Sequence, residues 1–360
     1  MTSTASDQPR WASPPQESIL SLLHEKGLSV EDLSDRLPLS DTETRRFIEG
    51  QVPMTLEIAE ALHLLIGGSA RFWMTRASHY VESVNWIDAD HLAHGMPLRD
   101  AARFGWIDES GDWVETAQRV LEYFGVRDAT EWRRRYQSSL AGAQYRVSKA
   151  FEANELAVIT WMRQVERTAD TLGLDEWNPS SFRGALQAAR KLTRIKNPET
   201  FYPRLQSLFR SVGVAVVIER PPTGCSINGA TFETRGGSKV IGLTARHRSD
   251  DVFWFTFFHE AGHVLEDDLT EPIIDDLEDE TLTKAEIAAD RFAEAELLQG
   301  YELSPKDGRS HTDVIRLAAR LGIAPGIIVG QLQHRDLLSH KSLNALKRSY
   351  DWSGTSLVQR

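Results

Sequence analysis

Apolar residues recur at helical spacing along most of the 360-residue chain. In the amino-terminal part, apolar positions three and four residues apart, bounded by Ser, Thr, Gly and Pro, predict four short helices. These helices are expected at residues 18–27, 29–37, 41–49 and 55–66. From about residue 86 to 192 the pattern stays helical and rich in tryptophan, which we interpret as packed core rather than a ligand cage. The amino-terminal half is therefore expected to be all-helical.

Runs of β-branched and alternating residues replace this pattern at 214–219, 229–234 and 239–243. Glycines separate the last two runs, and glycines between alternating runs are a hairpin signal. A helix is expected just before them, from about residue 200 to 212. The carboxyl-terminal half is therefore expected to contain a small sheet.

A helix that is apolar nearly all round follows the sheet, from about residue 252 to 265, and is expected to be buried. It contains His259-Glu260-Ala261-Gly262-His263, a His-Glu-x-x-His motif. Residues four apart share one helix face, so His259 and His263 can bind one metal ion, with Glu260 as the general base for a water. The alternative is a pair of core histidines bonded to backbone carbonyls. Burying such groups without partners is costly, which favours the metal.

A catalytic zinc usually has a third protein ligand, and a helix expected from about residue 283 to 298 offers Glu286. Asp290, one turn further, can accept a hydrogen bond from the free ring nitrogen of a ligating histidine. The alternative for Glu286 is a surface acid. Residues 266–280 between the helices are acidic and expected to be a loop. Small residues that would let the two helices approach are Ala285, Ala288, Ala289 and Ala293, and rival ligands are Glu266, Asp267, Asp268, Glu294 and Glu296.

Composition and charge narrow the class of protein. The chain has 41% hydrophobic and 26% charged residues, which is typical of a globular protein of two or three domains. It has no apolar run near the ~18–20 residues that span a membrane, no signal-peptide pattern at its start, and one cysteine, so a cytoplasmic protein is the simplest interpretation. A net charge of -11 argues against non-specific coating of nucleic acid but allows one small domain that reads a specific site.

The four amino-terminal helices resemble the Cro/repressor-type helix-turn-helix. The HigA-like antitoxin version is closest, since Pro53-Met54-Thr55 begins a fourth helix and Phe72-Trp73 follows. By this resemblance residues 41–48 form the recognition helix, and its candidates for phosphate or base contact are Thr42, Thr44, Arg45 and Arg46. Between Ser29 and Gly50, however, six acids stand against three arginines, a balance that gives little affinity for DNA. The alternative is a module for dimerisation or partner docking.

The metal motif resembles the ImmA/IrrE family of bacterial zinc metallo-endopeptidases. The resemblance rests on His259-Glu260-Ala261-Gly262-His263 and Glu286-x-x-Ala289-Asp290-x-Phe292-Ala293, and residues 250–258 and 325–334 are similar to members joined to a HigA-like, Xre-type helix-turn-helix. It implies a gluzincin site, with Zn²⁺ held by His259, His263 and Glu286, and cleavage of a transcriptional repressor. Two departures from the family's pattern, Ala288 and Leu265-Glu266-Asp267, bear on substrate choice.

We therefore expect a multidomain, mainly α-helical chain with an amino-terminal all-α helix-turn-helix and an α+β zincin-like peptidase domain. The expected parts are a disordered segment 1–14, a helix-turn-helix 15–85, a helical connector 86–196 and a peptidase domain with carboxyl-terminal helices 197–360. The expected activity is hydrolysis of a repressor or other regulatory protein in a stress, phage or toxin–antitoxin response. The competing hypothesis is an antitoxin-like DNA-binding regulator whose zinc site is sensory or structural. Operator DNA, a cognate toxin and a homodimer partner are further expected interactions.

Overall fold

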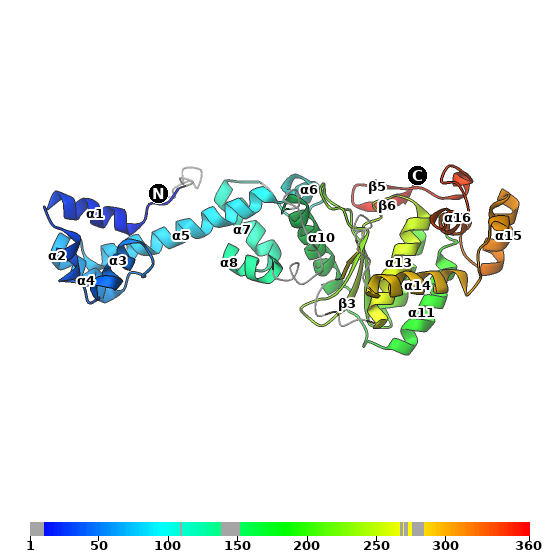
Figure 1. Cartoon of the computed structure of the whole chain (residues 1–360), viewed down its shortest axis with the longest axis horizontal. Coiled ribbons are helices and arrows are strands. Elements are labelled where there is room, and N and C mark those ends of the chain that lie inside the picture. Colours follow the sequence, from blue (N-terminus) through cyan, green and yellow to red (C-terminus); the bar gives the residue numbers. More distant parts are fainter. Residues whose placement is uncertain (1–10, 109, 138–151, 267–268, 270–272, 276–283) are drawn as a thin grey trace. The chain divides into compact units, whose positions relative to one another are not determined.

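The chain divides into two compact units (Figure 1). Unit 1 comprises residues 1–94 and 109–132, and unit 2 comprises residues 95–108 and 133–360. Each unit has a hydrophobic core of its own. The computed structural model describes residues 11–108, 110–137, 152–266, 269, 273–275 and 284–360.

Four short helices open unit 1, at the positions that the apolar pattern predicts. They are α1 (Pro15–Glu25), α2 (Val30–Ser34), α3 (Asp41–Ile48) and α4 (Leu56–Ile66). α2 and α3 each begin with a capping box, in which a serine and the acid three residues later accept hydrogen bonds from each other's backbone N–H. The apolar faces of the four helices meet around Phe47, Leu62 and Trp73, which are fully buried.

The remainder of unit 1 is also helical and packs through aromatic side chains. It contains α5 (Ala70–Gly95), α7 (Trp113–Phe124) and α8 (Ala129–Trp132). α7 begins after Asp112, whose carboxylate accepts two backbone hydrogen bonds, and ends at Gly125, which has a left-handed φ of 62°. Phe124 meets the buried Trp132 edge to face, with 5.7 Å between ring centroids. Trp132 is therefore a core residue, as the pattern predicts.

Unit 2 is built around a mixed sheet with the strand order β1-β3-β2-β4. Its strands are β1 (Val214–Ile218), β2 (Gly229–Glu233), β3 (Lys239–Leu243) and β4 (Ile273–Asp275). β1 runs parallel to β3, whereas β2 runs antiparallel to both β3 and β4. The sequence predicts the first three strands. The expectation of a loop throughout 266–280 is wrong at β4, where two consecutive β-branched isoleucines belong to a strand that pairs with β2.

Helices cover both faces of this sheet (Figure 1). Unit 2 contains α6 (Leu98–Arg103), α10 (Glu152–Asp170), α11 (Pro179–Leu192), α12 (Pro198–Arg210), α13 (Asp250–Glu266), α14 (Lys284–Leu298), α15 (His311–Leu321) and α16 (Pro325–His334). Alternate residues of a strand face opposite sides, so the glycines show which helix lies on each side. A Cβ on Gly242 would meet Trp161 of α10, and one on Gly229 would meet Glu260 of α13. α10 therefore covers one face and α13 the other.

α13 lies in the core of unit 2. Its Trp254 and Phe257 are fully buried and pack against aromatic residues of α12. The ring centroids of Trp254 and Phe201 are 5.0 Å apart, and those of Phe257 and Phe209 are 5.3 Å apart. The prediction of a buried helix is confirmed.

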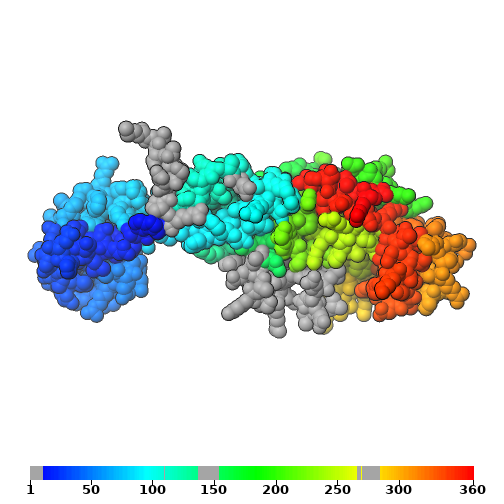
Figure 2. Space-filling model, turned by 90° about the horizontal axis from the view of Figure 1, so that it is seen from above, coloured from blue at the N-terminus to red at the C-terminus, as the bar shows by residue number. Residues whose placement is uncertain are grey.

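The carboxyl-terminal segment holds the first turn of α13. The chain ends in a hairpin of β5 (Tyr350–Ser353) and β6 (Ser356–Gln359). Just before this hairpin, Arg348 N donates a hydrogen bond to Asp250 Oδ1 at 2.9 Å, and Asp250 N donates one to Arg348 O at 3.0 Å. Figure 2 shows the end of the chain, in red, on the surface of unit 2. A segment almost a hundred residues away in sequence thus fixes where α13 begins.

The elements agree with the expected multidomain, mainly helical class of protein. Residues 86–196, expected to be a helical connector, contribute helices to both units. Within the described part of the chain, no helix is long and apolar enough to cross a membrane.

Candidate metal centre

α13 carries two histidines and a glutamate into the interior of unit 2. His259 is 3% exposed, His263 is 1% exposed and Glu260 is 0% exposed. Polar side chains at such depth are costly unless they have partners. These partners come from α14 on one side and from β2 on the other.

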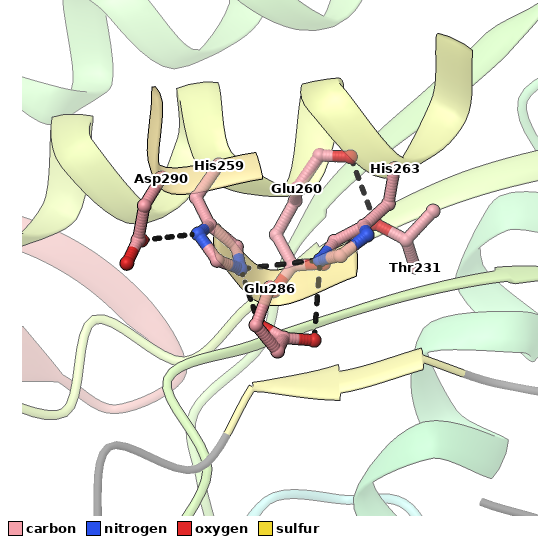
Figure 3. A network of polar contacts seen from close by, with 6 residues as sticks. All are labelled: Thr231, His259, Glu260, His263, Glu286 and Asp290. Atoms are coloured by element: carbon pink, nitrogen blue, oxygen red, sulfur yellow. Dashed lines mark hydrogen bonds and ion pairs between the residues drawn. The ribbon is translucent and has the colours of Figure 1, made fainter. Parts of the chain in front are cut away.

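Both imidazoles and the Glu286 carboxylate point toward one another (Figure 3). His259 Nε2 lies 3.1 Å from His263 Nε2. Glu286 Oε2 lies 3.0 Å from His259 Nε2, and Glu286 Oε1 lies 3.5 Å from His263 Nε2. One ligand atom from each of the three residues lies within 4.8 Å of the others. Two imidazole nitrogens and one carboxylate oxygen are the protein ligands of a common class of catalytic zinc site.

Asp290 fixes the ring of His259. Its Oδ1 accepts a hydrogen bond from His259 Nδ1 at 2.9 Å, which places the ring proton on Nδ1. In the neutral ring, the form that can bind a metal, the lone pair of His259 Nε2 is therefore directed at the point that it shares with His263 and Glu286. Because Asp290 follows Glu286 by one turn, α14 supplies both the carboxylate and the support for the histidine.

The electrostatics of Glu286 suit a metal ligand. Burial raises the pKa of this carboxyl, but when no metal is bound and both rings are protonated, hydrogen bonds and positive charge from His259 and His263 outweigh burial and lower the pKa to about 2. The carboxylate is therefore ionised at neutral pH. With two imidazole nitrogens facing the same point, this anionic oxygen completes a set of donors that fits a divalent cation.

Small residues let α14 approach α13 closely enough to deliver Glu286. A Cβ on Gly262 would lie 3.2 Å from the Cα of Ala289. Ala289 and Ala293 are buried, as expected for residues at the contact. Ala285 is exposed and plays no part in it.

Glu260 is held from the side of the sheet. Thr231 Oγ1 donates a hydrogen bond to Glu260 Oε2 at 2.6 Å (Figure 3). The sequence does not predict this contact, because a single threonine in a short strand matches no motif. Only the register of β2 against α13 reveals it.

Residues 212–332 match a family model, Peptidase_M78, described as the IrrE N-terminal-like domain. The matched stretch contains β1, β2, β3, both histidines and Glu286. Within unit 2, residues 212–332 are thus similar to the IrrE N-terminal-like domain. No curated protein and no solved structure matches the chain. Unit 1 lies outside the matched residues.

Two of the rival ligands, Glu294 and Glu296, have other partners. Glu294 Oε2 lies 2.9 Å from Arg335 Nη2, and Glu296 Oε2 accepts a hydrogen bond from Gln187 Nε2 at 3.0 Å. Among the acids that the structure describes, Glu286 is the one that joins the two histidines. Three rivals lie outside the described residues, namely Asp267, Asp268 and the side chain of Glu266.

The candidate DNA contacts lie on α3 in unit 1. Thr42, Arg45 and Arg46 are exposed, whereas Thr44 has 0% of its surface exposed. The expectation that Thr44 contacts DNA is therefore wrong. Thr44 shares the inward face of α3 with Phe47, three residues on, and both side chains lie inside unit 1.

Proposed function

We propose that this protein is a zinc-dependent endopeptidase. The observation that carries the proposal is the convergence of two buried imidazoles and one carboxylate next to a fully buried glutamate, within a stretch that matches a peptidase family. A structural zinc site needs no general base. Glu260, directly after the first histidine, therefore favours catalysis over a purely structural role.

His259, His263 and Glu286 would hold the ion, and Asp290 would keep the His259 ring oriented. When bound, zinc supplies Lewis acidity, which polarises the scissile carbonyl and makes a water nucleophilic at neutral pH. Glu260 accepts a proton from that water as its oxygen attacks the carbonyl carbon. Glu260 then donates the proton to the amide nitrogen as the C–N bond breaks, which regenerates the carboxylate.

The substrate that we propose is a protein, and the class we favour is a transcriptional repressor or another regulatory protein in a stress, phage or toxin–antitoxin response. The resemblance of the metal motifs to the ImmA/IrrE family supports this class. Proteins encoded beside this gene are the first candidates to test.

The experiment uses the full-length, zinc-loaded protein and a peptide library made by digesting a bacterial proteome. Mass spectrometry of new amino termini reports cleavage and sequence preference together. The matched control is Glu260→Gln, which keeps the shape of the side chain but cannot accept the proton. We expect the wild type to cleave and the variant to be about 10²–10⁴-fold slower, with the same zinc content. Equal cleavage by both proteins would rule out this mechanism.

A second candidate function concerns unit 1. The exposed Arg45 and Arg46 on α3, in a bundle of four short helices, favour a helix-turn-helix regulator that binds operator DNA. A gel shift with the DNA upstream of the gene tests this, with Arg45→Ala and Arg46→Ala as variants. Specific binding lost in both variants, without proteolysis of any neighbouring gene product, would favour an antitoxin-like regulator over the peptidase. A pull-down of the adjacent gene product tests for a cognate toxin.

A further inference from the structure

β2 presents two residues to the Glu260 carboxylate. Gly229 and Thr231 are two positions apart and so face the same side of the sheet, toward α13. Thr231 Oγ1 donates a hydrogen bond to Glu260 Oε2 at 2.6 Å, and both side chains have 0% exposure. A Cβ on Gly229 would lie 2.5 Å from Glu260 Oε1. Each oxygen of the carboxylate therefore has its own neighbour on the strand.

We propose that Thr231 and Gly229 position the general base, Glu260. One residue holds one carboxylate oxygen by a hydrogen bond, and the other leaves room for the second oxygen. Thr231 anchors Oε2 through its hydroxyl. Gly229 leaves the space that Oε1 occupies, so Oε1 is the oxygen that takes the proton from water and returns it to the leaving amine. This inference rests on the proposed endopeptidase function. Thr231 is a positioning residue, because it acts through Glu260 and does not touch substrate.

The backbone around Thr231 is suited to this role. Thr231 is paired with Ile241 of β3 on one side and with Ile273 of β4 on the other. Strands on both sides hold its Cα, and threonine's β-branching restricts its χ1 torsion. The hydroxyl thus comes from a rigid element, which orients a catalytic group better than a loop does.

The hydroxyl has one proton and two oxygens of Glu260 within reach. Glu260 Oε2 lies 2.6 Å from Thr231 Oγ1, and the Glu260 carbonyl oxygen lies 3.1 Å from it. A hydrogen bond to an ionised carboxylate is stronger than one to a neutral carbonyl, and 2.6 Å is typical of that stronger class. The hydroxyl therefore donates to the carboxylate while Glu260 is ionised.

Orientation matters because the terminal torsion of a glutamate is broad and is weakly restrained by itself. A displacement of about 1 Å at a reacting group can reduce a rate about 10²-fold. Valine has nearly the shape of threonine but no hydroxyl, so Thr231→Val releases Oε2 while it preserves packing. Thr231→Ser keeps the donor. Gly229→Ala keeps the donor and instead crowds Oε1.

The test uses a synthetic peptide chosen from those that the wild type cleaves in the library, and the full-length zinc-loaded protein. We expect Thr231→Val to lower kcat by about 10- to 100-fold, with KM and zinc content unchanged. Thr231→Ser should restore most of kcat. Gly229→Ala should lower kcat although Thr231 is intact. A Thr231→Val protein with kcat within about twofold of the wild type would overturn the inference.

A double-mutant comparison separates positioning from a general structural effect. In the Glu260→Gln background, Thr231→Val should leave the residual rate unchanged, because the group on which Thr231 acts is already absent. The same fold-loss in both backgrounds would overturn the inference. If the wild type cleaves no peptide, the proposed function fails; if it cleaves and only the Thr231 results disagree, the positioning inference alone fails.

A third readout does not depend on activity. In the zinc-free protein, Thr231→Val leaves a buried carboxylate without this donor, so the melting temperature should fall. In a Glu260→Leu background the same substitution should lower the melting temperature less. Equal falls in both backgrounds would show that the hydroxyl serves the fold and not Glu260.

Discussion

Two acids of unit 2, one buried and one partly buried, ionise in opposite ways. Asp250, at the first turn of α13, has 0% exposure, and burial raises its pKa to about 7 despite a hydrogen bond from the backbone of Arg348. Glu286, beside the two histidines, is also penalised by burial, yet its pKa falls to about 2 because His259 and His263 face it. The first acid is partly protonated at neutral pH, and the second is fully ionised.

The difference shows that burial alone does not set the charge of a carboxyl. Desolvation acts in the same direction on both carboxyls, and their partners decide the outcome. Asp250 receives a backbone N–H and the Arg348 guanidinium lies 3.9 Å away, which does not offset its desolvation. Glu286 meets two imidazoles. A metal ion requires a deprotonated ligand, and of the two acids only Glu286 keeps an ionised carboxylate at neutral pH.

The largest effect is expected from Glu286→Ala. It removes the anionic donor, so zinc affinity should fall by more than the roughly 100-fold seen when only a supporting group is lost, and peptidase activity should disappear. Equilibrium dialysis and elemental analysis measure the zinc. Glu260→Gln should keep its zinc while losing activity. Full zinc content in Glu286→Ala would remove this residue from the ligand set.

The Asp250→Asn variant tests the raised pKa of Asp250 through the pH dependence of stability. The pKa of Asp250 is about 7 in the folded protein, and its ordinary value, taken for the unfolded chain, is 3.8. At a pH between these two values, the folded state therefore holds a proton that the unfolded state has lost. The free energy of unfolding therefore falls as pH rises from about 4 to about 7, by on the order of 4 kcal/mol in full. Asparagine cannot ionise, so the free energy of unfolding of the Asp250→Asn variant should not fall in this way as pH rises.

Denaturant unfolding of the zinc-free wild type and Asp250→Asn, at about pH 5 and about pH 8, measures this difference. Comparing the two proteins cancels the titration of the histidines, which both contain. The variant should gain stability relative to the wild type at the higher pH. A constant difference across the two pH values would mean that Asp250 titrates in the ordinary range.

The sequence predicts which residues cluster around His259 and His263 because its signals are local. His259 and His263 are four apart on one helix, and Glu286 and Asp290 are four apart on another, so helical periodicity alone places each pair on one face. Ala289 and Gly262 mark the contact between the helices by their small size. These spacings and small residues therefore predict the cluster without any knowledge of the fold.

Helical periodicity does not predict contacts between segments that are distant in sequence. Thr231 is 29 residues from Glu260, and Arg348 is 98 residues from Asp250. Their meeting depends on strand register and on the path of the chain, which periodicity does not determine. Thr44 is a different case, because its three-residue spacing from Phe47 already places it on the inward face of α3. The resemblance to a recognition helix offered Thr44 as a contact, whereas the helical spacing favours its burial.

Gly326→Ala tests how tightly the first turn of α13 is enclosed. A Cβ at this position of α16 would lie 2.4 Å from Asp250 Oδ1, so the variant should lose about 1–3 kcal/mol of unfolding free energy through overpacking. Gly184→Ala is the matched control. Gly184 lies within α11 with nothing within 4 Å of an added Cβ, so alanine there should stabilise by about 0.5–1 kcal/mol. Denaturant unfolding measures the change in free energy of unfolding for both variants. Similar changes would mean that α16 can shift away from Asp250 at little cost.

Asp290→Asn should have the smallest effect, and it separates support of the metal from support of the fold. The amide oxygen of the variant can still accept from His259 Nδ1, but the neutral amide holds the ring less firmly than the carboxylate does. The Asp290 side chain is 36% exposed, so water can replace part of its contribution. Zinc affinity should therefore fall by about tenfold, the low end of the range for such groups, with little change in the melting temperature of the zinc-free protein. A chelator competition measures the affinity. A loss of melting temperature without a loss of affinity would place Asp290 with Asp250, among the acids that serve the fold.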